Sequence, residues 1–319
     1  MDWTFPTFAD VLRARRQIRP HLAATPLYAY PSLSRAVGAD VWVKHENHLP
    51  VGAFKVRGGV NLLSQMDEAV RRQGVIAAST GNHGQSIAYA ARLFGARAII
   101  CVPEGANPVK VEAMRDLGAE VVFHGRDYDD AREYCERLAA DEGYRYIHSG
   151  NEPLLIAGVA TLALEILEER PEVEMIIVPV GGGSGAAGAC VVAKAIRPDV
   201  RVIGVQSAAA PAAYRSWQAR RLLEDTMGTY AEGLATRTAF DLPQRILWAQ
   251  LDDFILVSDD EIRQAQRMMI EKTRNLVEAA GAAPLAAALS RTDEVAGRTI
   301  ALVCSGGNAS PQQLRALFD

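Results

Sequence analysis

Residues 175–188 read MIIVPVGGGSGAAG, an apolar run followed by five glycines within eight positions. The apolar run predicts a buried strand, and the small residues around the later glycines predict the start of a helix. Glycines at such a turn let successive backbone N–H groups converge on one phosphate, and the helix adds its positive N-terminal end. A plain strand-to-helix turn needs only one or two glycines. The stretch therefore predicts an α/β fold with a phosphate-binding loop.

The same loop also matches the dinucleotide-binding fingerprint, because Gly183, Gly185 and Gly188 have the required spacing. That fingerprint needs an acidic residue about 20 positions further on, where it holds the ribose hydroxyls. Here the next predicted strand ends Val-Gln-Ser at residues 205–207 and offers no carboxylate. An NAD-dependent oxidoreductase is therefore a remote alternative, and the sequence favours a ligand with a single phosphate.

Around this loop, short apolar runs alternate with segments of helical period, a pattern typical of α/β proteins with a mainly parallel sheet. Local signals mark helix ends: Asn107 with Pro108 begins one helix, and Gly118 ends it. Residues 207–251 have no clear period, and only a helix near 212–223 is predicted there. The predicted strands are 75–78, 98–102, 120–123, 175–180, 201–205, 254–257 and 299–303. The other predicted helices are 85–94, 258–274 with a capping box, and a short one from Ser310.

The chain of 319 residues has an ordinary composition for a globular protein, with 49% hydrophobic residues, 23% charged residues and a net charge of −4. This composition excludes a disordered chain, and the lack of a basic field argues against nucleic acid as a partner. No apolar run is long enough for a signal peptide or a membrane span. The four cysteines are far apart and match neither a zinc site nor a disulfide framework. We therefore expect a cytoplasmic protein without membrane contacts.

A second polar turn, Ser-Thr-Gly-Asn-His-Gly-Gln at residues 79–85, lies between a predicted strand and a predicted helix. A single hydroxyl there would be explained as a helix cap. Seven consecutive small or polar residues exceed what a cap needs, and together they offer hydroxyls, an amide and backbone N–H groups. This turn is therefore a candidate site for a carboxylate.

Lys55 follows a Gly-Ala-Phe turn and begins a segment with apolar residues at Val56, Val60, Leu62 and Leu63. A single lysine is ordinarily solvated at the surface. The apolar residues after it indicate instead that Lys55 faces a pocket. A desolvated amine loses its proton easily and becomes a Schiff-base nucleophile.

Two further clusters are weaker signals. His45, Glu46 and His48 form a poor metal-binding pattern, and we interpret them as structural. Residues 303–308, Val-Cys-Ser-Gly-Gly-Asn, follow the last predicted strand, where ligands gather in open α/β sheets. Within that stretch we interpret Cys304 as a small buried hydrophobe and not as a nucleophile.

Taken together, these motifs resemble the pyridoxal-phosphate enzymes of fold type II, the tryptophan-synthase-β-like group, and within it the threonine/serine dehydratase and serine racemase family. The resemblance implies a two-domain, three-layer α/β/α fold. Its large domain would comprise residues 1–66 and 150–319, and its small mobile domain residues 67–149. It also implies a pyridoxal-phosphate-dependent ammonia-lyase, most simply a homodimer, that converts a small-molecule L-β-hydroxy-α-amino acid to a 2-oxo acid and ammonia.

By this resemblance, Lys55 carries the cofactor as a Schiff base and moves the α-proton. Thr80 lies where racemases of the family carry a serine hydroxyl, so an amino-acid racemase is the alternative function. Ser305 offers a neutral hydroxyl to the pyridine nitrogen, which favours elimination over transamination. The implied cofactor-binding residues are Phe54, Lys55, Asn82, Gly181, Gly182, Gly183, Ser184, Gly185, Glu278 and Ser305. The implied substrate-binding residues are Ser79, Thr80, Gly81, Asn82 and His83.

The chain departs from the family pattern beside the expected substrate side chain. His-Ser-Gly at residues 148–150 stands where the family commonly has His-Pro-aromatic, and Ala53 stands where it usually has Ser or Thr. The smaller wall predicts room for a bulkier β-substituent, as in the phenylserine dehydratase-like subgroup. Gln206 and Ala212 stand where metal-activated relatives carry carboxylates, and neither provides an anionic oxygen for Mg²⁺ or Ca²⁺. The sequence therefore predicts no metal site.

Overall fold

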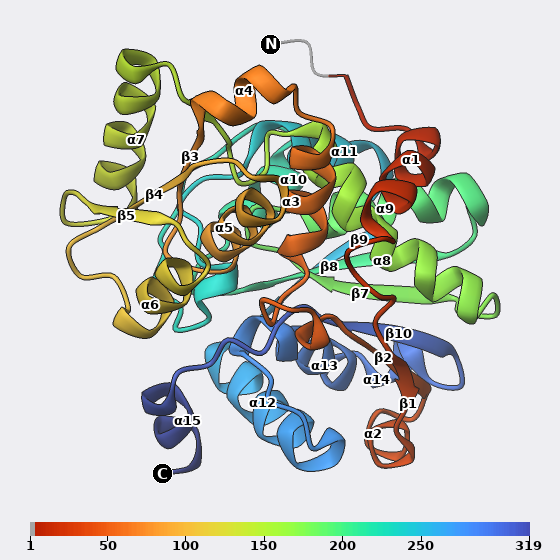
Figure 1. The fold of residues 1–319 in the computed structure, drawn as a ribbon. Helices are drawn as coiled ribbons and strands as arrows, with labels where there is room; N and C mark the ends of the chain where they lie inside the picture. Colours follow the sequence, from red (N-terminus) through yellow and green to blue (C-terminus); the bar gives the residue numbers. More distant parts are fainter. Residues whose placement is uncertain (1–3) are drawn as a thin grey trace.

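The computed structural model describes residues 4–319 and contains two sheets flanked by helices (Figure 1). The larger sheet has the order β1-β2-β10-β7-β8-β9; β1 and β2 are antiparallel, and all other neighbours are parallel. Its central strands are apolar throughout because helices cover both faces. Its strands are β1 (Leu27–Ala29), β2 (Asp40–His45), β7 (Met175–Pro179), β8 (Arg201–Ser207), β9 (Asp253–Val257) and β10 (Thr299–Cys304).

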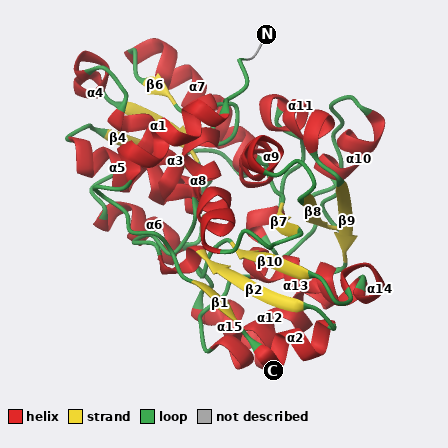
Figure 2. Ribbon diagram, turned by 90° about the vertical axis from the view of Figure 1, so that its right-hand side faces the viewer, coloured by secondary structure: helices red, strands yellow, loops and turns green. Residues whose placement is uncertain are grey.

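The smaller sheet is parallel throughout, with the order β5-β4-β3-β6. Figure 2 shows β4 and β6 in one part of the molecule and β1, β2 and β10 in another. Its strands are β3 (Val75–Ala78), β4 (Ala98–Val102), β5 (Glu120–Phe123) and β6 (Arg145–Tyr146). The two helix-covered sheets confirm the predicted α/β class and its three layers. The domain boundaries at 66/67 and 149/150, and the mobility of the small domain, stay predictions.

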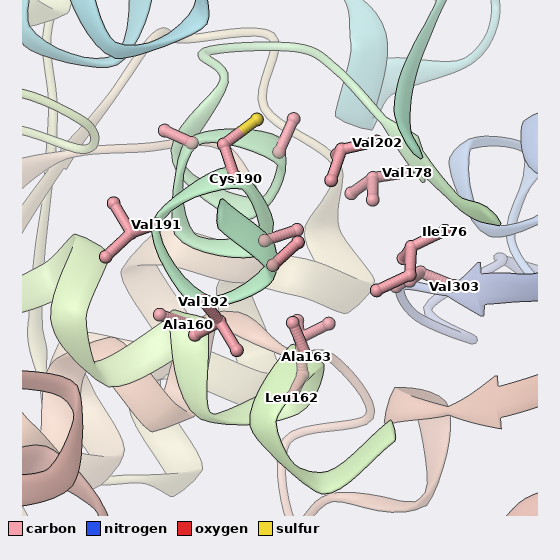
Figure 3. Packing of buried hydrophobic residues seen from close by; sticks show 14 of the residues in the cluster. Ala160, Leu162, Ala163, Ile176, Val178, Cys190, Val191, Val192, Val202 and Val303 are labelled. Atoms are coloured by element: carbon pink, nitrogen blue, oxygen red, sulfur yellow. The ribbon is translucent and has the colours of Figure 1, made fainter. Parts of the chain in front are cut away.

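Helices pack on both faces of each sheet. On the larger sheet, one apolar cluster includes residues of α1 (Phe8–Ile18), α8 (Pro153–Glu169), α9 (Ser184–Ile196) and α11 (Asp241–Gln250). Figure 3 shows part of this cluster, where α8, α9 and β7 meet. The opposite face is covered by α2 (Pro31–Val37), α12 (Asp259–Thr273), α13 (Ala279–Ser290) and α14 (Thr292–Val295).

The smaller sheet has α3 (Lys55–Ser64), α5 (Asn82–Phe94) and α6 (Pro108–Asp116) on one face and α7 (Tyr128–Glu142) on the other. The remaining elements are α4 (Glu68–Gln73), α10 (Ala212–Ala219), α15 (Pro311–Phe318) and the 3₁₀ helices η1 (Glu46–His48) and η2 (Glu232–Leu234). In the described part of the chain, no helix has both the length and the apolar character needed to cross a membrane.

All seven predicted strands are present, with ends within two residues of those expected. The capping boxes of α12 at Ser258 and of α15 at Ser310 are confirmed. Two helix predictions need correction, and one helix was missed. Helix α5 begins at Asn82 and not near Gln85, because the Ser79 hydroxyl accepts hydrogen bonds from the N–H groups at its start. Helix α10 ends at Ala219 and not near residue 223. Helix α11 was not predicted, because Pro243 in its first turn obscures the helical pattern.

Candidate active site

The predicted site residues come together around one cavity of about 400 Å³ between the two sheets' loops. Lys55 is the first residue of α3, and its Nζ donates to the Ser184 hydroxyl at 2.8 Å and to the Ser149 carbonyl oxygen at 3.2 Å. The start of α3 is tied to the end of β10, since the Phe54 N–H donates to the Ser305 carbonyl oxygen at 3.0 Å. Burial lowers the pKa of Lys55 to about 8. The amine is thus fixed in place and easily deprotonated.

The glycine loop connects β7 to α9 and lies beside the Lys55 amine, which donates to Ser184. Close packing explains its composition. A Cβ on Gly181 would lie 2.3 Å from the Gly233 carbonyl oxygen, and Gly183 has a φ of +88°. The first N–H groups of a helix have no partner within the helix, so the start of α9 presents donors and a positive dipole end next to this loop. The loop can therefore hold a phosphate group.

The polar turn at residues 79–83 follows β3, at the carboxyl end of the smaller sheet. The Ser79 hydroxyl accepts from the N–H groups of Gly84 at 2.9 Å and Gly81 at 3.2 Å and so holds the start of α5, whose N-cap position is Gly81. Its own hydrogen is still available for donation. Ser79, Thr80, Gly81, Asn82 and His83 all line the cavity.

His83 and Asn82 are held differently. His83 is buried with Nε2 3.3 Å from the Ile147 carbonyl oxygen, and its Nδ1 has no partner among the described residues. Burial, together with the charge of Lys55, lowers the pKa of His83 to about 3, so its ring is neutral. The Asn82 amide donates to Glu278 Oε1 and accepts from Asn308 Nδ2, both at 2.8 Å. Asn308 is thus a positioning residue for Asn82, a role that the sequence did not indicate.

Glu278 and Ser305 complete the inner wall. Glu278 caps α13, and burial raises the pKa of its carboxyl group although Lys110 opposes this shift. Ser305 is buried directly after β10 and lines the cavity. Cys304 is fully buried in the apolar cluster under α13, and burial raises the pKa of its thiol, which confirms its interpretation as a core residue.

The histidine and glutamate cluster after β2 has structural partners. Glu46 accepts from the guanidinium of Arg57 at 2.7 Å, and the second carboxylate on that guanidinium is Glu165, at 2.6 Å from Nη1. Lys44 donates to Glu165 at 2.5 Å. Arg57 lies two residues after Lys55 on α3, so this buried ionic network anchors the helix that carries the amine.

Gln206 is buried in β8, and its Oε1 accepts from the Tyr214 N–H at 3.0 Å. This amide oxygen is therefore already used where metal-activated relatives carry a carboxylate. That the protein needs no metal stays a prediction.

Sequence reasoning missed the residues that close the cavity from its outer side. Lys110 on α6 forms an ion pair with Glu232, and Arg237 lies 3.5 Å from Asp129. Phe240 also lines the cavity. Three of these five residues lie in the stretch 207–251, where no period was recognised. Its two glycines, Gly228 and Gly233, and its interspersed charged residues were the available signal.

The arrangement defines a class of enzyme in which a buried lysine lies beside a phosphate-binding loop at a substrate cavity. The residues present fit pyridoxal phosphate: the loop and the start of α9 suit its phosphate, the Lys55 amine its aldehyde, and Ser305 its ring nitrogen. The model of the "Pyridoxal-phosphate dependent enzyme" family matches residues 18–306, and the chain belongs to that family. Its cofactor is pyridoxal phosphate, and the dinucleotide alternative is wrong.

Comparison with individual relatives assigns the chain to a narrower group within this family. It is 37% identical over 305 residues to an L-threonine ammonia-lyase of Thermotoga maritima, covering 95% of this chain and 75% of the relative. It is 33% identical to an L-threo-3-hydroxyaspartate ammonia-lyase of Saccharomyces cerevisiae, over 98% of this chain and 96% of that one. The structure of maize serine racemase matches with a TM-score of 0.92 and 30% identity, over 99% of this chain and 97% of that chain. These matches confirm the predicted threonine/serine dehydratase and serine racemase group of lyases.

Proposed function

We propose that the protein removes water from an L-3-hydroxy-α-amino acid and releases a 2-oxo acid and ammonia. The observation that carries this proposal is the position of the Lys55 amine between the glycine loop and the polar turn at residues 79–83. Bound pyridoxal phosphate supplies an electron sink that stabilises negative charge on the substrate α-carbon. Sequence similarity to a bacterial and a yeast ammonia-lyase supports the same reaction.

The 79–83 turn, Lys55 and Ser305 have separate roles in this reaction. The 79–83 turn binds the substrate carboxylate with hydroxyl and N–H donors and so orients the α-carbon. Lys55, with its lowered pKa, takes the α-proton when it is a free amine and acts as an acid once protonated. The β-hydroxyl leaves with a proton as water, and a second water converts the unsaturated amine to 2-oxo acid and ammonia. Ser305 is neutral and does not hold a proton on the ring nitrogen, which favours this elimination.

Racemisation is the second candidate function, because Thr80 places a hydroxyl on the cavity wall and the fold matches a serine racemase. Racemisation requires a proton donor on the face of the α-carbon opposite Lys55. The methyl group of Thr80 restricts the rotamers of its hydroxyl. We therefore propose elimination as the main reaction and racemisation as a minor one.

The test follows 2-oxo acid, ammonia and D-amino acid together, from L-threonine and L-serine. We expect 2-oxo acid to form faster than D-amino acid. Thr80→Ala should lower racemisation and keep most of the elimination, whereas Thr80→Ser should raise racemisation. Faster formation of the D-amino acid by the wild-type protein would replace the dehydratase assignment with the racemase one.

We further propose that the protein is a cytoplasmic homodimer whose small domain, residues 67–149, moves against the rest of the chain. The four cysteines are free and buried, which suits a reducing compartment. Tyr28 and Leu276 are each about half exposed and offer apolar contacts for a second copy. Light scattering of the purified protein measures the oligomeric state directly.

A further inference from the structure

Phe240 fills the space that the small residues of the cavity wall leave open. A Cβ on Gly150 would lie 2.5 Å from Cδ2 of the Phe240 ring, and a Cβ on Gly182 would lie 2.1 Å from Cε2. Both distances are shorter than any normal contact, so the ring occupies the positions that larger side chains would take. The ring therefore covers the wall at Gly150, which argues against the room for a bulkier β-substituent expected from the sequence.

The ring packs on residues that neighbour the hydrogen-bond partners of Lys55. Lys55 is held by Ser149 and Ser184, and the two glycines under the ring adjoin these partners: Gly150 follows Ser149 directly, and Gly182 comes two residues before Ser184. Phe240 is also part of the cavity lining. A substrate attached next to the Lys55 amine therefore meets this ring with its side chain.

The ring is also held firmly. His148 meets it edge to face, with ring centroids 4.8 Å apart and an interplanar angle of 82°. The backbone of Gly150 and Gly182 supports the ring, and Phe240 directly precedes α11. A substituent that pushes the ring away must break these contacts, and overpacked apolar sites resist such displacement.

We propose that Phe240 sets the upper size limit for the substrate side chain and restricts the protein to L-3-hydroxy amino acids with hydrogen or a methyl group on the β-carbon. Phe240 thus takes the place of the aromatic residue that the family commonly carries in the His-Pro-aromatic turn. This inference rests on the proposed dehydratase function, since it concerns the substrate of that reaction.

The experiment compares kcat/KM for L-threonine and for L-threo-3-phenylserine in the wild type, Phe240→Leu and Phe240→Ala. Apolar pockets discriminate by about 10- to 200-fold per methylene group. We expect the wild type to prefer threonine at least about 100-fold, Phe240→Ala to reduce that preference at least about tenfold, and Phe240→Leu to give an intermediate value. The cofactor absorbance of each variant is recorded to show that the glycine loop still holds pyridoxal phosphate.

Phe94→Ala is the matched control. Phe94 also meets a histidine edge to face, with a centroid distance of 5.2 Å to His21, but it ends α5 and does not line the cavity. The Phe94→Ala variant should leave the ratio of kcat/KM for threonine to kcat/KM for 3-phenylserine unchanged. A double variant, Phe240→Ala with Gly150→Phe, returns an aromatic ring to the turn and should restore the preference for threonine.

The outcomes separate the two proposals. A wild type that dehydrates threonine but prefers 3-phenylserine overturns the role of Phe240, as does a ratio that stays constant in both Phe240→Leu and Phe240→Ala. A wild type that forms no 2-oxo acid from any L-3-hydroxy amino acid overturns the proposed function itself.

Discussion

The two walls of the cavity are held by opposite kinds of interaction. The inner wall carries Lys55 and the glycine loop, and the helix that carries Lys55 is anchored by Arg57 and Glu46, whose side chains are 1% and 0% exposed. The outer wall is closed by Arg237 with Asp129, whose side chains are 49% and 38% exposed. Exposed ion pairs are worth little and exchange easily, whereas breaking a buried pair costs several kcal/mol.

This difference in burial indicates that the two walls of the cavity have different roles. The chemistry depends on an amine fixed within hydrogen-bond distance of its partners, so a buried network is suited to hold it. Substrate has to enter and product has to leave, so the outer wall needs contacts that open at low cost. Lys110 lies between these extremes: it is buried, but its partner Glu232 is 43% exposed and also accepts from Gln313 on α15.

The largest effect should come from the fixed amine itself. Lys55→Ala should lower kcat by about a thousandfold or more, because Lys110, the other lysine that lines the cavity, is held in an ion pair with Glu232 and does not replace the Lys55 amine. The absorbance of the bound cofactor should also disappear. Borohydride reduction followed by peptide mass mapping identifies the labelled lysine. Lys272→Ala, at an exposed lysine of α12, is the control and should keep wild-type activity; label on a lysine other than Lys55 would show that the assignment is wrong.

The second effect concerns the anchor of that amine. Arg57→Met leaves Glu46 and Glu165 without their common cation and should lower the free energy of unfolding by about 3–5 kcal/mol. Arg13→Met removes an exposed pair with Asp10 and should cost about 0–1 kcal/mol. Urea unfolding of both variants tests the comparison. Equal losses in the two variants would mean that the buried network is not a stabilising anchor.

Sequence reasoning found the parts of the site that depend on local chemistry. The glycine loop, the 79–83 turn and Lys55 are each defined by neighbours within a few residues. Their role could therefore be predicted from the local sequence. The ring that covers Gly150 comes from Phe240, 90 residues further along the chain, and nothing near Gly150 indicates it. The ion pair between Lys110 and Glu232 spans 122 residues. Such contacts arise only when the fold brings distant segments together.

Helices and strands were likewise predicted only where the local sequence pattern is regular. Strands with both faces buried are continuous apolar runs and were predicted correctly. Helix α11 has a proline in its first turn and buries Gln244 beside Ile246, so its pattern is not that of a regular amphipathic helix. Missing it also hid the segment before it, which carries Glu232, Arg237 and Phe240.

The pKa of Lys55, about 8, distinguishes this buried lysine from an ordinary solvated one. Only the free amine attacks an aldehyde, so the rate at which apoenzyme captures pyridoxal phosphate should rise about tenfold per pH unit below 8 and level off above it. Burial keeps the pKa of His83 at about 3 and that of His148 at about 4, so neither ring titrates in this range. Stopped-flow absorbance from pH 6 to 10 gives the profile. A rate that still rises steeply at pH 10 would indicate a solvated lysine.

The smallest effect should come from the outer wall. Arg237→Gln removes a half-exposed ion pair with Asp129, and such pairs are worth at most about 1 kcal/mol, equivalent to roughly a fivefold change. Because this pair only helps to close the cavity, we expect KM for the amino acid to rise two- to fivefold, roughly, while kcat stays within about twofold. Asp129→Asn also removes this pair and should raise KM at least as much, because Asp129 loses a second ion pair, with Arg132, as well.

Salt distinguishes this explanation from direct contact with substrate. Exposed pairs are screened at high ionic strength, where the Debye length falls to about 3 Å at 1 M. The KM of the wild type should therefore approach that of Arg237→Gln in 1 M NaCl, and the variants should respond little. If the difference between wild type and variant persists in high salt, or if kcat falls instead of KM rising, then Arg237 acts on the substrate itself and the outer wall is not merely a weak closure.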